Sequence, residues 1–207
     1  MEEKYVITIG RKLGSGGKQI GEMLASQLKI SCYDKELIQI ASKESGLCKE
    51  FFEQADEKPG FSLISGMFGL SSYGGSDFFT ENYLCNESLF KIQSDVIRKL
   101  AGQQSCIFVG RCADYILREH PRKLSVFISA DIKDRIPRIA ELQNLSEDKA
   151  KTLIEQADKK RAGYYNYYSN KVWGMATSYD LCINSSAFGI EKTVACILYF
   201  AQKKFLN

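Results

Sequence analysis

The sequence predicts an α/β fold in which a parallel β-sheet lies between layers of helices. Three short segments, 105–109, 124–128 and 179–183, are continuously apolar rather than alternating, which is typical of strands covered on both faces. Helical patterns separate these segments, and a chain that alternates strand and helix favours a parallel sheet. A further apolar segment, 5–10, is followed directly by a glycine-rich turn and a helical pattern, which adds another unit of the same kind.

The remaining elements follow in the same alternating order. After the glycine-rich turn we expect a helix at 19–28 and then a short candidate strand at 30–33. Ser146 precedes a group of acidic residues, so its side chain is expected to cap the start of a further helix. Other helical patterns are found at 35–44, 81–101, 113–119, 132–143 and 190–204.

Residues 61–79 do not fit this alternation. Nine glycines and serines stand there among scattered Phe, Leu and Met residues. The segment is too long for a routine connection and too apolar for a free linker. Two interpretations fit it: a flap that packs when a ligand binds, or an irregular loop that is permanently packed or partly disordered.

The composition is that of an ordinary globular protein and excludes several classes of partner. Of the 207 residues, 44% are hydrophobic and 26% charged, and the net charge of +3 is too small to indicate binding of a nucleic acid polymer. No segment approaches the roughly 20 apolar residues of a membrane span. Residues 1–4 lack the charged-then-apolar pattern of a signal peptide. We therefore expect a cytoplasmic protein with no membrane partner.

The cysteines do not predict a metal site or a disulfide framework. There are seven, none in a C-x-x-C pair, and His120 is the single histidine. This spacing argues against a four-ligand zinc site, and the odd number argues against systematic pairing. Cys106, Cys182 and Cys196 lie in apolar segments, where we expect them to act as small buried hydrophobic residues.

The glycine-rich turn at 14–18 is the strongest candidate for a binding site. Its glycines allow the backbone to approach an anion closely, and the following helix presents unpaired N–H groups with a partial positive charge. Lys18 adds a formal charge. In the common phosphate-loop pattern, G-x-x-x-x-G-K-[ST], Lys12 stands at the first glycine and Gln19 at the hydroxyl residue. A tight connection without a ligand remains the alternative.

Charged side chains follow several of the predicted strands. The carboxyl ends of parallel strands meet at one edge of a sheet, where ligands bind, so these side chains are expected to converge. Arg111 could bind a phosphate through two hydrogen bonds, or form a buried salt bridge with Asp34 or Asp131. Asp34 could orient magnesium-bound water, accept a proton, or cap the helix at 35–44.

Two further clusters lie on predicted helices. Arg135 and Arg138 are three residues apart, as are Asp158 and Arg161, so the members of each pair share a helix face with their partner. Tyr165 continues the second stripe. Arginines on a closing segment can neutralise the charge of a phosphoryl group during transfer. The alternative is that both clusters are ordinary solvated helix faces.

These motifs together resemble those of the P-loop nucleoside monophosphate kinases, most closely the cytidylate-kinase-like family. The resemblance implies a three-layer α/β/α P-loop kinase fold with a five-stranded parallel sheet and a helical lid. It further implies one domain over 1–207, with a variable insertion or acceptor-binding region at about 45–85 and the lid at about 131–172. The matching stretches are 7–18, 33–38, 108–111, 126–130, 158–161 with 164–168, and 179–184.

The resemblance also implies roles for individual residues. The residues expected to bind the phosphates of ATP are Gly14, Ser15, Gly16, Gly17, Lys18 and Gln19. Those expected to act in catalysis are Lys18, Arg111, Arg135, Arg138 and Arg161. Those expected to bind the acceptor are Asp34, Arg111, Asp158, Arg161 and Tyr165. The implied cofactor is Mg²⁺ with ATP, held through the substrate phosphates, with Asp34 as a candidate protein ligand.

The implied activity is ATP-dependent phosphoryl transfer to a nucleoside monophosphate, with CMP or dCMP favoured. Two alternatives remain: a P-loop kinase for another small metabolite, and a catalytically impaired nucleotide-binding regulatory protein. The chain departs from the family pattern at Gln19, in place of a hydroxyl residue, and at Cys112, where an aspartate is usual. The sequence predicts neither the acceptor's identity nor the oligomeric state.

Overall fold

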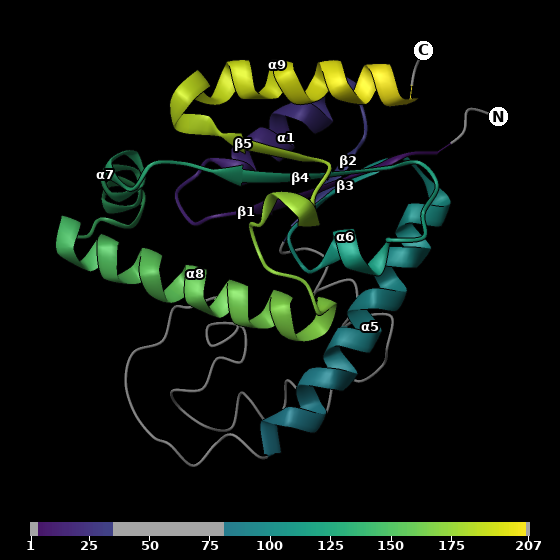
Figure 1. The fold of residues 1–207 in the computed structure, drawn as a ribbon, viewed down its shortest axis with the longest axis horizontal. Helices are drawn as coiled ribbons and strands as arrows, with labels where there is room; N and C mark the ends of the chain where they lie inside the picture. Colours follow the sequence, from purple (N-terminus) through teal and green to yellow (C-terminus); the bar gives the residue numbers. More distant parts are fainter. Residues whose placement is uncertain (1–3, 35–80, 206–207) are drawn as a thin grey trace. The chain divides into compact units, whose positions relative to one another are not determined.

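The computed structural model describes the chain at residues 4–34 and 81–205 (Figure 1). Contacts between Cα atoms divide the chain into two units, 1–34 with 100–207, and 35–99. The first unit contains the sheet and the glycine-rich turn. The predicted insertion at 45–85 falls almost entirely outside the described residues.

In the described part of the chain five strands form one all-parallel sheet; the sequence patterns predict a parallel sheet and the family resemblance implies the five strands. Their order is β2-β3-β1-β4-β5, so the first strand of the chain lies at the centre. In this central strand, Ile7 lies opposite Ile107 on one side and Leu124 on the other. The strands are β1 (Val6–Arg11), β2 (Ser31–Tyr33), β3 (Cys106–Val109), β4 (Lys123–Ser129) and β5 (Leu181–Asn184).

Helices cover both faces of the sheet and give the unit three layers. In Figure 1, α1 (Gly17–Leu28) and α9 (Ser185–Phe205) lie along one face, and α6 (Ala113–Ile116) and α8 (Glu147–Ser169) lie along the other. The other elements are α5 (Glu81–Gln103), α7 (Ile132–Gln143) and the 3₁₀ turn η1 (Ala176–Ser178). No helix in the described part of the chain is long and apolar enough to cross a membrane.

The core lies between the sheet and the helices α1 and α9. The strands contribute side chains to it that are removed from water, because both faces of the sheet are covered. This explains why the strands read as continuous apolar segments. The largest fully buried side chains in this core are Ile7, Ile9, Ile20, Leu24, Ile107, Leu124, Ile128 and Ile197.

Several local predictions are confirmed and others require correction. Ser146 caps α8, accepting a hydrogen bond from the backbone N–H of Lys149 at 3.5 Å. Helix α6 ends at Ile116 rather than 119, because the chain continues in tight turns, such as the bond from His120 N–H to the Leu117 carbonyl. Helix α9 begins earlier than predicted and is bent at Gly189, where φ is 75°.

The prediction for Cys182 is wrong. Its side chain is exposed, whereas Cys106 is buried as predicted and Cys196 is partly buried. Cys182 lies on β5, an outer strand of the sheet, so its apolar neighbours in sequence do not imply cover on both faces. The predicted helix at 35–44 and the segment 61–79 lie outside the described residues.

Truncating a core side chain should weaken the fold measurably. The Ile107→Ala variant removes a fully buried side chain from β3 and is expected to lower the free energy of unfolding by about 3 kcal/mol. Urea denaturation followed by circular dichroism measures this. Leu142→Ala, at a position 71% exposed on α7, is the control and should change stability by less than about 0.5 kcal/mol. Equal losses in the two variants would contradict this placement of the core.

Candidate active site at the glycine-rich turn

The glycine-rich turn takes a conformation that its glycines make possible. Gly14 and Gly16 both have left-handed backbone angles, with φ of 78° and 76°. A Cβ atom on Gly16 would lie only 2.3 Å from Cδ1 of Ile190, so a side chain there is excluded by space as well as by φ. The Ser15 hydroxyl donates to the Lys12 carbonyl at 2.8 Å and closes the turn from within.

Helix α1 begins directly at the end of this turn. Its N-cap residue is Gly16, which has no side chain to accept bonds from the first-turn N–H groups. These donors and the helix dipole together make a site that favours an anion. Lys18 and Gln19 are exposed in the same turn of helix, and Lys18 Nζ lies 3.5 Å from Glu22 Oε1 in a pair that is more than half exposed. The Lys18 side chain is therefore accessible to solvent at the start of α1.

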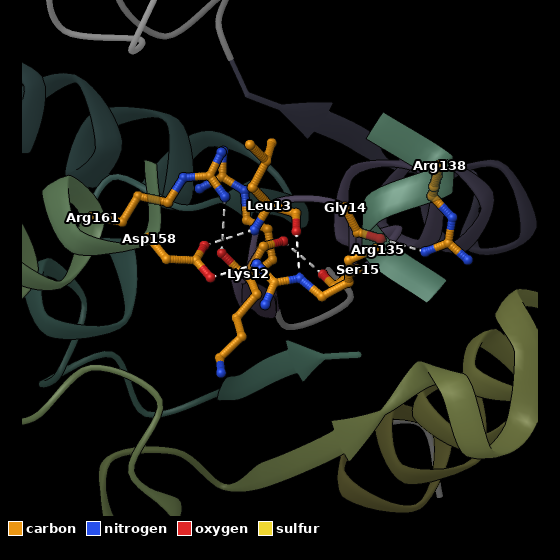
Figure 2. A network of polar contacts seen from close by, with 9 residues as sticks. Lys12, Leu13, Gly14, Ser15, Arg135, Arg138, Asp158 and Arg161 are labelled. Carbon is orange, nitrogen blue, oxygen red and sulfur yellow. Dashed lines mark hydrogen bonds and ion pairs between the residues drawn. The ribbon is translucent and has the colours of Figure 1, made fainter. Parts of the chain in front are cut away.

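Helices α7 and α8 hold the turn by its backbone (Figure 2). Arg135 Nε donates to the Leu13 carbonyl at 2.7 Å, and Asp158 Oδ1 accepts from the Leu13 N–H at 2.9 Å. Arg135 and Asp158 also form an ion pair with each other. Arg138 Nη1 donates to the Gly14 carbonyl. The peptide groups on both sides of Leu13 are thus bound by one charged pair.

The same strand-to-helix connection is also anchored from β4 and α9. The Lys12 N–H donates to the Ile128 carbonyl at 3.0 Å, which continues the pairing of β1 with β4 past the end of the strand. The Ser185 hydroxyl at the start of α9 lies 2.8 Å from the Ser15 carbonyl and 3.1 Å from the Ser129 carbonyl. The turn is therefore held on several sides before any ligand is bound.

A second group of charges lies where β1, β2 and β3 end. Arg11, the last residue of β1, donates from Nη2 to Asp34 Oδ1 at 3.0 Å. Arg161 of α8 donates to the Arg11 carbonyl at 3.1 Å. Arg111 follows β3 with a left-handed φ of 62°. We call Arg11, Arg111, Arg161 and Asp34 the arginine cluster.

The electrostatics of the arginine cluster favour an anionic ligand. The pKa of Arg161 is lowered to about 10, mainly by burial and then by the charge of Arg11, against the raising effects of Asp158 and Asp34. Burial also lowers the pKa of Arg111, and Arg11 again adds to the effect. Guanidinium groups that depress one another's pKa are stabilised by a negative ligand placed between them.

The sequence patterns assign no individual role to Arg11, although the structure brings it into this cluster. Among the sequence predictions Arg11 appears only as part of the stretch 7–18 that carries the family resemblance. The available signal was its position as the charged end of a buried strand, at the same sheet edge as Arg111. Asp34 forms an ion pair with Arg11 and also interacts electrostatically with Arg111, while Asp131 accepts from Asn184 at 2.8 Å.

The sequence-predicted residues fall into three places. The start of α1 carries Lys18 and Gln19. The turn is bound by Arg135, Arg138 and Asp158. The arginine cluster contains Asp34, Arg111 and Arg161. Tyr165 lies elsewhere. Its hydroxyl donates to Asp114 Oδ2 at 2.7 Å in a buried contact between α8 and α6. The assignment of Tyr165 to acceptor binding stays a prediction.

Cys112 belongs to the same buried layer as Tyr165. It is only 4% exposed, and burial together with the nearby charge of Asp114 raises the pKa of its thiol. Burial likewise raises the pKa of Asp114, against the lowering effect of the Tyr165 hydrogen bond. Cys112, which departs from the family pattern, is therefore a buried residue at the N-cap of α6, beside Asp114.

The described residues offer few ligands for a metal ion of their own. No group of three or more His, Cys, Asp or Glu side chains in the described part of the chain could hold a metal ion. Asp34 is engaged with Arg11, while the amide of Gln19 is exposed beside the turn. Among the described residues, these side chains do not form a metal site of their own.

Comparison with known proteins gives one family and one fold. Residues 6–187 match the family described as the cytidylate kinase-like family. Among curated proteins, none matches this chain. An uncharacterized protein from Eubacterium ventriosum, known from its crystal structure, is 25% identical, with a TM-score of 0.73 over 96% of this chain and 99% of that one.

Shikimate kinases share the fold at lower identity. The enzyme from Acinetobacter baumannii, solved in complex with shikimate, is 14% identical, with a TM-score of 0.55 over 100% of this chain and 97% of that one. The enzyme from Bacteroides thetaiotaomicron is also 14% identical, with a TM-score of 0.52 over 96% and 97%. At this identity the likeness concerns the fold alone.

Removing the carboxylate that holds the turn should destabilise the protein. Asp158→Ala deletes the acceptor of the Leu13 N–H and leaves Arg135, whose side chain is 5% exposed, without its opposite charge. We expect a loss of about 3 kcal/mol in the free energy of unfolding, because an uncompensated charge stays buried. Asp158→Asn keeps an acceptor oxygen and should lose less. Urea denaturation of both variants provides the measurement.

The control for this experiment is Glu119→Ala. Glu119 pairs with Arg118 at 3.6 Å but is 91% exposed, so its removal should cost less than about 0.5 kcal/mol. A comparably small loss for Asp158→Ala would mean that α7 and α8 do not hold the turn through this pair.

The Tyr165→Phe variant separates a structural from an acceptor-binding role. Loss of the buried hydroxyl leaves Asp114 without its hydrogen bond, so the free energy of unfolding should fall by about 1–2 kcal/mol. The KM for a phosphate acceptor should not change. Tyr199→Phe, at a position 60% exposed, is the control for stability. A raised acceptor KM with unchanged stability would instead support the role that the sequence predicts.

Proposed function

Because this chain belongs to the cytidylate kinase-like family, we propose that it transfers the γ-phosphoryl group of ATP to a nucleoside monophosphate. CMP and dCMP are the favoured acceptors, on the resemblance of its motifs. The observation that carries the proposal is the placement of the arginine cluster beside an anion-binding turn. A donor and an acceptor phosphate would both find positive charge there.

The turn would bind the donor. The first-turn N–H groups of α1 and the left-handed glycines Gly14 and Gly16 suit the β- and γ-phosphates of ATP, and Lys18 would add a charge beside them. Ser15, Gly17 and Gln19 complete the proposed phosphate-binding set. The contacts of Arg135 and Arg138 with the turn's carbonyls support a rigid cradle, which reduces the reorganisation needed during transfer.

The arginine cluster would bind the acceptor's phosphate. In the proposed step an oxygen of this phosphate attacks the γ-phosphorus of ATP and forms the new P–O bond. The bond between the γ-phosphorus and the β–γ bridging oxygen breaks, and ADP leaves with the electron pair. Arg111 and Arg161 would neutralise the charge that develops. No protein nucleophile is needed, because the attacking oxygen belongs to the substrate.

Asp34 and Asp158, which the sequence also predicts as acceptor residues, are kept as part of the proposal, whereas Tyr165 is given a structural role at Asp114. Asp34 and Asp158 each have an arginine partner, so their first effect would be to hold those guanidinium groups in position. A Mg²⁺ ion bound with ATP would neutralise charge on the β- and γ-phosphates. Gln19, exposed in the first turn of α1, would be a candidate protein ligand for this ion, whereas the pairing of Asp34 with Arg11 disfavours a direct Asp34 ligand.

Two alternatives would use the same site. The shared fold with shikimate kinases supports including small hydroxylated metabolites as acceptors, since one fold can serve many substrates. The amide of Gln19 at the position of a hydroxyl residue favours a nucleotide-binding protein with impaired catalysis. Both are distinguished from the first proposal by which acceptors are converted.

An ADP-release assay over a panel of acceptors tests the proposal. The panel contains CMP, dCMP, UMP, AMP and GMP together with shikimate and other small hydroxylated metabolites, each with Mg²⁺ and ATP. Turnover with CMP or dCMP is the expected result. Turnover only with a non-nucleotide identifies the metabolite kinase, and ATP binding without any turnover identifies the regulatory protein.

Replacing the lysine of the turn should remove activity. In Lys18→Ala the charge beside the donor phosphates is lost, and we expect kcat/KM to fall at least about 100-fold. Lys29→Ala is the matched control, because Lys29 is an exposed lysine at the opposite end of α1. The same assay measures both variants. Unchanged turnover in Lys18→Ala would overturn the role given to the turn.

A further inference from the structure

Arg11 is an unusual residue for the end of a central strand. Its side chain is only 16% exposed, and the strand that carries it is paired on both sides. Burial lowers the pKa of Arg11, which means that its charged form is held there at some cost, partly offset by Asp34. Buried arginines are retained in proteins where their charge is paired or meets a ligand.

The fold leaves a channel for this side chain between two glycines. A Cβ atom on Gly17 would lie 2.5 Å from the Cβ of Arg11 and 2.9 Å from its Cγ. A Cβ atom on Gly110 would lie 1.9 Å from Nη1 of Arg11 and 2.8 Å from Cζ. The Arg11 side chain therefore runs from the first turn of α1 to the end of β3, and a side chain at Gly110 would displace its guanidinium group.

This path brings Arg11 between the proposed donor and acceptor sites. At one end it contacts Gly17 of the turn, and at the other it reaches Gly110, the residue before Arg111. Arg161 donates to the Arg11 carbonyl, so the third arginine approaches from α8. The three guanidinium groups thus come from β1, the end of β3 and α8, and they meet at one sheet edge.

The arginine cluster contains more positive than negative side chains. Within the cluster Asp34 is the carboxylate, whereas the neighbouring Asp158 is bound to Arg135 and to the Leu13 N–H. The cluster's three guanidinium groups and one carboxylate together carry a charge of about +2 at neutral pH. A phosphate monoester carries a charge close to −2 at neutral pH, whereas a carboxylate carries −1.

We propose that Arg11 is a third arginine for the acceptor's phosphate, and that with Arg111 and Arg161 it selects dianionic phosphate over a monoanionic carboxylate. The inference rests on the proposed function for the identity of the acceptor, but the preference for a dianion does not depend on it. Guanidinium groups bind phosphate through paired hydrogen bonds, so each contributes direction as well as charge. Asp34 then serves to orient Arg11.

Ion binding tests the preference without assuming any acceptor. The donor site is filled with a non-hydrolysable ATP analogue, and the melting temperature is followed as inorganic phosphate, sulfate or acetate is added at constant ionic strength. Phosphate and sulfate should stabilise the wild-type protein, and acetate should not. In Arg11→Met this stabilisation should be lost, and Arg11→Lys should retain part of it. Arg118→Met, which removes an exposed arginine outside the cluster, should behave as wild type.

Kinetics of the same variants test the acceptor role. In Arg11→Met the KM for CMP should rise about 10- to 100-fold, the loss expected for one charge-assisted contact, while the dissociation constant for ATP stays within about twofold. Gly110→Ala should reproduce the CMP effect, because its Cβ displaces the Arg11 guanidinium. Circular dichroism of each variant verifies that it is folded.

The outcomes separate this inference from the proposed function. Equal stabilisation of wild type and Arg11→Met by phosphate would overturn the inference whatever the enzyme converts, and leave Arg11 as a structural partner of Asp34. A parallel loss of ATP and CMP binding would also overturn it, since that result indicates a damaged turn. Dianion stabilisation that depends on Arg11 without turnover of any nucleoside monophosphate would support the inference and reject the proposed function. Stabilisation by acetate equal to that by phosphate would contradict the selectivity.

Discussion

The ion pair between Arg135 and Asp158 is the contact on which the candidate site depends. A turn rich in glycine is intrinsically flexible, so its usefulness for binding phosphate rests on what fixes its backbone. Here the charged pair binds both the carbonyl and the N–H of Leu13, using two helices that follow the central strand by more than a hundred residues. The turn is thus held by long-range contacts in addition to its own glycines and the Ser15 hydrogen bond.

This dependence explains which parts could be read from the sequence. The strands, the order of the helices and the start of α1 directly after the glycine-rich turn follow from local patterns, and these predictions agree with the structure. The partners of Arg135 and Asp158 could not be predicted from local patterns. They are backbone groups of a turn more than a hundred residues away, and the spacing of residues along the chain does not indicate such contacts. Arg11 was overlooked for a related reason: the glycines that make room for it, Gly17 and Gly110, lie far apart in the chain.

The two departures from the family pattern act on different parts of the molecule. Cys112 is buried beside Asp114 and directly follows Arg111 in the sequence. Gln19 lies in the exposed first turn of α1. One departure is therefore buried next to the end of β3 and the other is open to solvent, although both appear in the sequence as single-residue substitutions.

The channel between Gly17 and Gly110 also restricts how this protein can change over generations. A side chain gained at Gly110 while Arg11 is present collides with the guanidinium group, whereas the same change after Arg11 has been lost meets no such obstacle. The order of the two substitutions therefore matters. Once Gly110 has been replaced, an arginine at position 11 can no longer take its present conformation. If Arg11 binds an anion as proposed, descendants that keep Arg11 and Gly110 retain that preference, whereas those that lose Arg11 first can accept a neutral ligand.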